Sequence, residues 1–180
     1  MLQDLHRYGG ELSGTVKLEF GSGLSGRIGR QLARKLGLPT QAGDQKLHVV
    51  ISHKNGALYW SRQFNSAHTM VSVFTPKGHY PAGYWHESTG KLSFKLGVNL
   101  LEGGWYWVLK NITFMGVPMP AWLFPSSHAY KRITDGLYEF SVTFRLPLLG
   151  QLVSYSGKLS PHAASNVIDY GEQSIDHDAP

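Results

Sequence analysis

The chain of 180 residues carries 17 Lys and Arg against 12 Asp and Glu, has 42% hydrophobic residues, and contains no cysteine. This length and balance are typical of one folded domain with a sizeable core, and they exclude a mostly disordered chain. The lack of cysteine excludes disulfides, thiol nucleophiles and thiolate metal sites, and no apolar run approaches the roughly 20 residues that span a bilayer.

The charge is distributed unevenly. Four of the acids lie within residues 167–180, where neither Lys nor Arg occurs, so residues 1–166 carry a net charge of about +9. A basic body attracts nucleic acid, anionic lipid or an acidic small molecule, or it is simply a solvated surface. No RNA-binding signature or recognition-helix pattern occurs, so we expect no nucleic-acid partner. Residues 1–7 lack the apolar run of a signal peptide, which favours a cytoplasmic location.

The first predicted elements are a strand and a helix. Residues 12–20 alternate apolar and polar side chains, which is typical of a strand with one buried face. After the breaker at 21–23, apolar residues spaced four apart predict a helix over 24–36 that ends at Gly37 and Pro39. The apolar stripe consists of Leu24, Ile28, Leu32 and Leu36. The other positions of the helix include the cations Arg27, Arg30, Arg34 and Lys35.

From residue 46 onward the pattern is that of strands. Asn55-Gly56 and Asp135-Gly136, each between two apolar runs, predict tight hairpin turns. Residues 116–127 form a proline-rich connection with an apolar centre, and residues 161–180 form an acidic tail that we expect to be disordered. The predicted strands occupy residues 47–51, 58–64, 70–74, 80–86, 92–100, 105–114, 128–133, 138–146 and 151–159.

About ten strands in neighbouring hairpins predict a mainly β domain over residues 1–160, namely an antiparallel up-and-down β-barrel. A helix between the first and second strands resembles the calycin barrels of intracellular lipid-binding proteins, in which a helix covers the barrel mouth. The main rival, the helix-grip fold, needs a long C-terminal helix, and residues 160–180 do not supply one.

Four stretches of the chain form recognisable motifs: Gly-Leu-Pro at 37–39, Trp-Ser-Arg-Gln-Phe at 60–64, Gly-Val-Pro-Met-Pro at 116–120, and the segment 146–157. With them, residues 5–160 resemble a bacterial family known only as a domain of unknown function, number four-one-six-six. Members of this family occur alone or attached to larger proteins, including saccharopine-dehydrogenase-like ones. The motifs are turns and strands, so the resemblance implies a family but no mechanism and no catalytic residue.

Arg62 is the most informative single residue. By strand alternation it shares a face with Trp60 and Phe64, so an inward face would place a guanidinium in an apolar cavity. An anionic head group, typically a carboxylate, would then pair with it. The alternatives are that Arg62 meets an internal acid, or that its face points outward and the guanidinium lies over Trp60.

Tyr84, His86 and Tyr130 complete the predicted ligand-binding set. Tyr84 and His86 share a strand face, whereas Glu87 points to the opposite side, which argues against a His–Glu catalytic pair. Tyr130 alternates with His128 and Arg132. That row lines either a polar patch of the cavity or the solvent face, with Ala129, Lys131 and Ile133 opposite.

The sequence gives little support for a metal, a cofactor or a nucleophile. No His-x-His, His-Glu-x-x-His, nucleophile elbow or phosphate-binding loop occurs. The five tryptophans and nine tyrosines are typical of a lined binding cavity or of an aromatic barrel filling. We therefore expect no metal, no cofactor and no assigned catalytic residue.

Three functions fit these observations. The favoured one is a carrier or sensor that holds a small molecule or lipid inside the barrel, one that is hydrophobic or amphipathic and with or without a negative charge. The helix would then act as a lid whose basic face makes transient contact with anionic membrane. The second is a cofactor-free cyclase or isomerase that uses Arg62, Tyr84, His86 or Tyr130 on a hydrophobic substrate. The third is an accessory domain whose barrel is filled by side chains. The oligomeric state stays open.

Overall fold

The computed structural model describes residues 2–79, 81–89, 92–101, 104–119 and 126–162. These residues form helices α1 (Leu2–Tyr8) and α2 (Gly23–Leu36) and eleven strands in one sheet. The strands are β1 (Gly10–Phe20), β2 (Gly43–Lys54), β3 (Ala57–Phe64), β4 (His68–Lys77), β5 (Tyr84–Thr89), β6 (Leu92–Leu101), β7 (Gly104–Phe114), β8 (Val117–Met119), β9 (Ser126–Thr134), β10 (Leu137–Leu146) and β11 (Gly150–His162).

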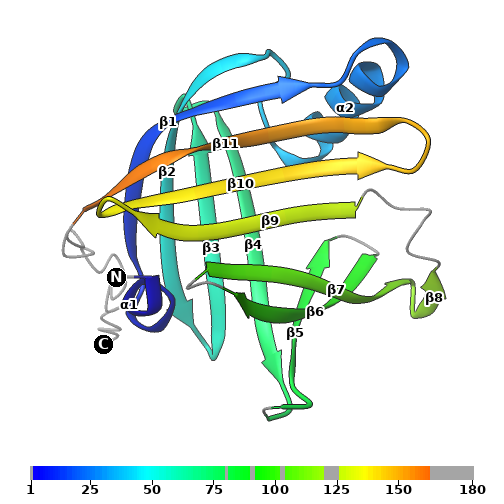
Figure 1. Cartoon of the computed structure of the whole chain (residues 1–180). Coiled ribbons are helices and arrows are strands. Elements are labelled where there is room, and N and C mark those ends of the chain that lie inside the picture. Colours follow the sequence, from blue (N-terminus) through cyan, green and yellow to red (C-terminus); the bar gives the residue numbers. More distant parts are fainter. Residues whose placement is uncertain (1, 80, 90–91, 102–103, 120–125, 163–180) are drawn as a thin grey trace, which may run out of the picture.

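The sheet closes into an antiparallel barrel of ten strands. Neighbouring strands pair in the order β6-β5-β4-β3-β2-β1-β11-β10-β9-β7, and β6 also pairs with β7, which completes the ring (Figure 1). The short strand β8 pairs with the last residues of β7. Closure removes the exposed edges that an open meander would leave. The predicted mainly β barrel with a helix after its first strand is confirmed.

Tight turns fix the register of the hairpins. Asn55 and Gly56 join β2 to β3, and Asp135 and Gly136 join β9 to β10. All four residues have a positive φ, as a two-residue turn that follows the strand twist requires. These two hairpins form as the sequence predicts.

The barrel interior is lined by alternate residues of each strand. On β1, β2 and β3 most inner positions are aliphatic or aromatic, and they pair across strands, as in Leu12 with Val49 and Ile51 with Trp60. On β10 and β11 the inner row pairs Val142 with Tyr155. The most deeply buried inner side chains are Leu12, Leu18, Leu47, Ile51, Leu58, Phe64, Tyr138, Tyr155 and Leu159.

We name the two ends of the barrel after their helices. The α2 end is where β1 ends and β11 begins, and the α1 end is where β1 begins and β11 ends. The Gly21 N–H at the start of α2 donates to Leu152 O of β11 at 3.0 Å, and Leu38, which follows the helix, is buried in the core. Helix α2 therefore lies across the rim at the α2 end of the barrel (Figure 1).

The buried face of α2 differs from the predicted apolar stripe. The buried helix residues are Ser25, Gly26, Gly29 and Ala33, and a Cβ on Gly29 would clash with the carbonyl of Leu152. Small residues thus let the helix backbone approach β11 closely. Of the predicted stripe, Leu32 and Leu36 pack against the core while Leu24 is exposed, because a stripe with a spacing of four drifts around the helix.

Two further elements were not predicted. Helix α1 precedes β1 and buries Leu5 and His6 at the α1 end. The connection expected over 116–127 contains β8 and the start of β9. The last strand ends at His162, and the predicted tail from residue 163 lies outside the described residues.

Candidate functional site

Polar side chains from four strands meet inside the barrel. They are Arg62 on β3, Ser72 on β4, Glu87 on β5 and Lys131 on β9, and we call them the inner cluster. Strand alternation brings them there, because Ser72 is paired with the inward Trp60 and Glu87 is paired with the inward Phe74. The cluster contains two basic groups and one carboxyl group.

Trp60 is the common neighbour of the two cations. The Lys131 Nζ lies 3.4 Å from the centroid of the Trp60 ring, and the Arg62 guanidinium carbon lies 5.2 Å from it. Arg62 also donates a hydrogen bond from Nη1 to Ser72 Oγ at 3.2 Å. Lys131 is 4% exposed, and its Nζ lies 5.5 Å from the Trp107 ring. An aromatic ring beside a buried cation offsets part of its lost hydration.

Burial shifts the proton affinities of this cluster toward uncharged groups. Desolvation lowers the pKa of Lys131 well below its ordinary value, and the nearby charge of Arg62 adds to the shift, while Glu87 opposes it. Desolvation also raises the pKa of Glu87, against the hydrogen bond from Ser72 and the charges of Arg62 and Lys131. Arginine keeps its charge under these conditions, so the interior retains a positive group.

Two buried polar atoms beside the cluster make no hydrogen bond to any residue that the structure describes. They are Trp60 Nε1 and the Tyr138 hydroxyl. Burial raises the pKa of Tyr138, and that shift is opposed by the charge of Arg62. Buried donors without a protein partner are uncommon and are usually satisfied by water or a bound molecule.

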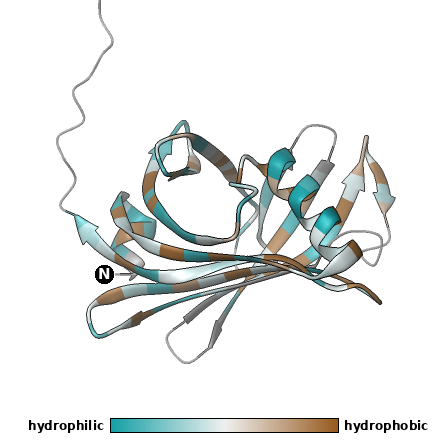
Figure 2. Cartoon of the chain, turned by 90° about the horizontal axis from the view of Figure 1, so that it is seen from above, coloured by the Kyte–Doolittle hydropathy of each residue, from teal (hydrophilic) through white to brown (hydrophobic). Residues whose placement is uncertain are grey.

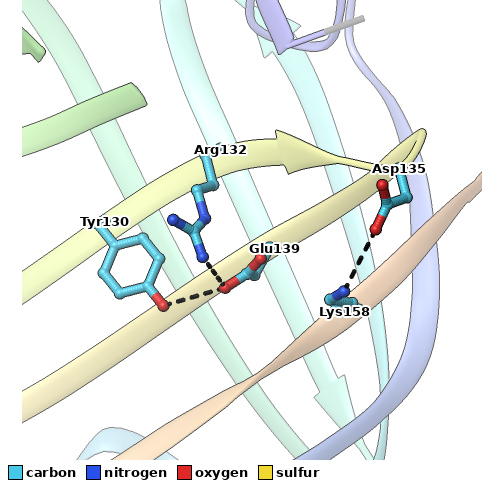
Figure 3. A network of polar contacts seen from close by, with 5 residues as sticks. All are labelled: Tyr130, Arg132, Asp135, Glu139 and Lys158. Carbon is cyan, nitrogen blue, oxygen red and sulfur yellow. Dashed lines mark hydrogen bonds and ion pairs between the residues drawn. The ribbon is translucent and has the colours of Figure 1, made fainter. Parts of the chain in front are cut away.

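A second polar group, the outer cluster, lies on the solvent side of β9 and β10 (Figure 3). Arg132 Nη2 donates to Glu139 Oε1 at 2.7 Å, and the Tyr130 hydroxyl donates to the same oxygen at 3.3 Å. The hydrogen bond from Arg132 is the main reason that the pKa of Glu139 falls to about 2. This cluster ties neighbouring strands together on the outer surface.

The structure separates the six predicted ligand-binding residues. Trp60 and Arg62 meet at the inner cluster, and Arg62 there combines two alternatives, since it lies near an internal acid and also contacts Trp60. Phe64 is fully buried core and packs edge-on against Tyr155 at 5.7 Å.

The other three residues lie on the outer face. The Lys95 Nζ lies 5.1 Å from the centroid of the Tyr84 ring, and His86 contacts Ser88 at 3.4 Å. Glu87, which lies between His86 and Ser88 in the sequence, points inward. Tyr130 belongs to the outer cluster. Tyr84, His86 and Tyr130 therefore do not share a face with Arg62, because strand alternation turns their side chains to the outer side of the barrel.

The sequence analysis did not name Glu87 or Lys131 as site residues. It placed Glu87 opposite His86, and it left open whether the row of Tyr130 or the row of Lys131 faces the barrel interior. The available signal was parity, because Phe74 is inward and its register partner Glu87 must share its face.

A shallow groove of about 320 Å³ lies on the outer wall of β1, β2 and β3. It is lined by Ser13, Gly14, Thr15, Lys46, Leu47, His48, Gln63, Asn65 and Ser66, so it contains none of the predicted site residues. No group of His, Asp and Glu in the described part of the chain has the arrangement of a metal site. Neither described helix is long and apolar enough to cross a bilayer.

Comparison with known proteins gives a family. Searches of curated proteins and of solved structures gave no significant match. A family model described as "Domain of unknown function (DUF4166)" matches residues 1–159, which takes in every strand of the barrel almost to the end of β11 and the whole inner cluster. The resemblance expected from the sequence is thereby confirmed, and the chain belongs to the DUF4166 family.

Proposed function

We propose that the barrel binds an amphipathic small molecule with an acidic head group, as a carrier or sensor, and that the inner cluster recognises the acid. One observation carries this proposal: two basic side chains and a single carboxyl lie inside an aromatic barrel, around Trp60. A cytoplasmic location accords with a chain that has no cysteine.

An acidic head group would resolve the electrostatic imbalance. A carboxylate accepts two parallel hydrogen bonds from a guanidinium, which suits Arg62. Its negative charge would also favour the charged form of Lys131, whose pKa is lowered by burial and by Arg62. Trp60 Nε1 and the Tyr138 hydroxyl are available as donors, because neither bonds to a described residue.

The apolar part of such a ligand has an aromatic wall beside the cluster. Phe74 and Trp107 stack with their centroids 4.9 Å apart, and Trp85 meets Trp107 edge-on at 6.4 Å. Lys131 lies close to the same Trp107 ring. Apolar walls with a few convergent polar groups are the usual composition of a small-molecule site.

Native mass spectrometry of the purified chain tests for a retained ligand, and titration with dansyl-labelled undecanoic acid tests the head group. We expect the acid to bind and its methyl ester to bind about tenfold more weakly, since a charge-assisted hydrogen bond contributes about 1.5–3 kcal/mol. Arg62→Leu should weaken acid binding by a similar factor. Arg132→Leu, which replaces an arginine on the outer face of β9, is the matched control and should bind the acid like the unmodified chain.

Equal affinity for acid and ester, or equal effects of Arg62→Leu and Arg132→Leu, would contradict the proposal. The absence of both a retained ligand and probe binding would favour the accessory role, with side chains as the only occupants of the barrel.

One observation supports a second candidate, a cofactor-free enzyme. A lowered pKa increases the share of Lys131 that is present as the neutral amine, which is the nucleophilic form. Lys131 Nζ would attack the carbonyl carbon of an aldehyde or ketone, and loss of water would leave an imine. Incubation with decanal and borohydride, followed by peptide mass spectrometry, tests this role. Preferential reductive labelling of Lys131 over the exposed Lys54 and Lys77 supports it, and labelling of the exposed lysines alone contradicts it.

A further inference from the structure

We propose that the α2 end of the barrel docks on an anionic membrane surface, with α2 on the lipid head groups and two apolar hairpin tips inserted beside it. The proposal concerns a surface rather than the interior, so it stands independently of any ligand.

Exposed apolar side chains gather at this end. Among the described residues, five of the large hydrophobic side chains that face solvent lie there: Leu24, Phe114, Met115, Val117 and Leu148. Leu148 forms the tip of the β10–β11 hairpin and is fully exposed, and Met115 lies at the β7–β8 turn with 66% of its surface exposed. Clustered exposed apolar residues mark interaction surfaces.

The backbone at these two tips is unusual. Leu148 has a φ of 66° and Met115 has a φ of 52°, in the left-handed region that favours Gly, Asn and Asp. The other described non-glycine residues with positive φ are Asn55, Asn65, Ser66 and Asp135, all small and polar. Large apolar side chains therefore occupy two turns whose backbone conformation disfavours them.

The hairpin tips at the α1 end are different. The β2–β3 and β9–β10 turns there are Asn55-Gly56 and Asp135-Gly136, which are the residues that tight turns prefer. The apolar tips are thus a property of one end and not of the barrel's hairpins in general.

Helix α2 supplies a basic face next to these tips. At about 100° per residue, Leu24, Arg27, Arg34 and Lys35 fall on the side opposite the buried Gly29 and its small neighbours. The helix contains no Asp or Glu. Hydrophilic residues follow the visible side of the helix in Figure 2. A cationic helix face with an apolar residue among the charges is typical of segments that lie on anionic lipid.

The basic face and the apolar tips share one side of the molecule. The N–H of Gly21, just before α2, donates to Leu152 O, and Leu152 lies four residues beyond Leu148. Helix α2, the β10–β11 turn and β8 all lie toward the right of Figure 1. Charge and apolar surface are therefore presented together, which fits a lipid bilayer better than a soluble polyanion, for which exposed leucine adds nothing.

The experiment is co-sedimentation of the full chain with vesicles of phosphatidylglycerol and phosphatidylcholine, or of phosphatidylcholine alone. We expect binding to the anionic vesicles that falls with added salt, and little binding to the neutral ones. The double variant Met115→Ser/Leu148→Ser should bind about tenfold more weakly. Arg27→Glu/Arg34→Glu should do the same. All four residues are exposed, and circular dichroism melting verifies that each variant folds.

Two matched controls make the test specific. Lys54→Glu/Lys77→Glu changes the net charge equally at the α1 end, and Val71→Ser/Val108→Ser removes exposed apolar residues from the barrel wall. Both should bind like the unmodified chain. Equal binding to neutral vesicles, an equal loss in the α1-end variant, or unchanged binding of Met115→Ser/Leu148→Ser would each overturn the proposal. The last result would indicate a general polyanion surface.

Discussion

Adjacent residues on β9 belong to two clusters of similar composition and opposite environment. Lys131 points into the barrel and Arg132 points to solvent, and each lies near one glutamate. In the outer cluster, a hydrogen bond from Arg132 lowers the pKa of Glu139 to about 2. In the inner cluster, desolvation raises the pKa of Glu87 although two basic groups are near. Burial, and not residue type, decides which way a carboxyl group shifts.

The largest expected difference between the clusters concerns their aromatic members. Trp60 is 3% exposed and contacts both inner cations, so Trp60→Ala should lower the free energy of unfolding by about 3–5 kcal/mol. Tyr130 is only half-buried, so Tyr130→Ala should cost less than about 1 kcal/mol. Urea unfolding measures both. Similar losses would mean that the inner cluster is no better packed than the outer one.

The arginines come next. Arg62→Leu removes the hydrogen bond to Ser72 and the positive charge that most favours ionisation of Glu87, and should cost about 1–3 kcal/mol. Arg132→Leu breaks a surface ion pair and should cost less stability than Arg62→Leu. The same unfolding assay compares them. The distinction between the clusters fails if Arg132→Leu proves the more costly substitution.

Lys131 should show the opposite sign. Lys131→Met replaces a buried amine with an apolar side chain of similar length, so we expect an increase in stability of about 1 kcal/mol near neutral pH. The same variant should bind the dansyl-labelled acid more weakly, as a site that trades stability for function would. Thermal melting and probe titration of one preparation measure both effects. A loss of stability would show that the ammonium is well compensated in the fold.

The smallest expected effect is a pair of opposite pH dependences. The pKa of Glu87 is raised by folding, so its contribution to stability is complete below pH ~4.5 and is lost as the pH rises through the folded-state pKa. The pKa of Glu139 is lowered by folding, so its contribution is present above pH ~4.5 and is lost as the pH falls toward 2.

Urea midpoints of the unmodified chain, Glu87→Gln and Glu139→Gln should be measured from pH 3 to 8. At each pH the midpoint of the unmodified chain is subtracted from that of the variant, because the abnormal titration of Lys131 affects all three proteins. The difference for Glu87→Gln should shift toward stabilisation as the pH rises. The difference for Glu139→Gln should shrink as the pH falls. Slopes of the same sign would refute the assigned environments.

The barrel was predictable because its signals are local. Period-two alternation and the turns at Asn55-Gly56 and Asp135-Gly136 define neighbouring hairpins, and closure follows from the cost of open edges. The apolar residues around Arg62 on β3 made an inward position one of the two orientations that the sequence allowed. Each of these features depends on residues close together in the chain.

What was missed depends on distant contacts. The burial of Lys131 is compensated by Trp60, which lies on a strand far away in sequence, so alternation near residue 131 could not decide between its two faces. Helix α1 has only seven residues and is held by burial of Leu5 and His6 rather than by its own propensity. The small residues of α2 make sense only once β11 lies against them.

The strands of the barrel are not paired equally around the ring, and the pairing of β7 with β9 is the shortest. Only two described residue pairs join these strands, Trp105 with Lys131 and Tyr106 with Tyr130, whereas β10 and β11 are joined along most of their length. Fewer described residue pairs join β7 to β9 than join any other two adjacent strands of the ring. Weakly paired places open first in native proteins. Because Lys131 is itself one of the residues that join β7 to β9, a transient side opening would lead directly to the inner cluster while α2, fixed by the close contacts of Gly29 and Gly37, stays in place.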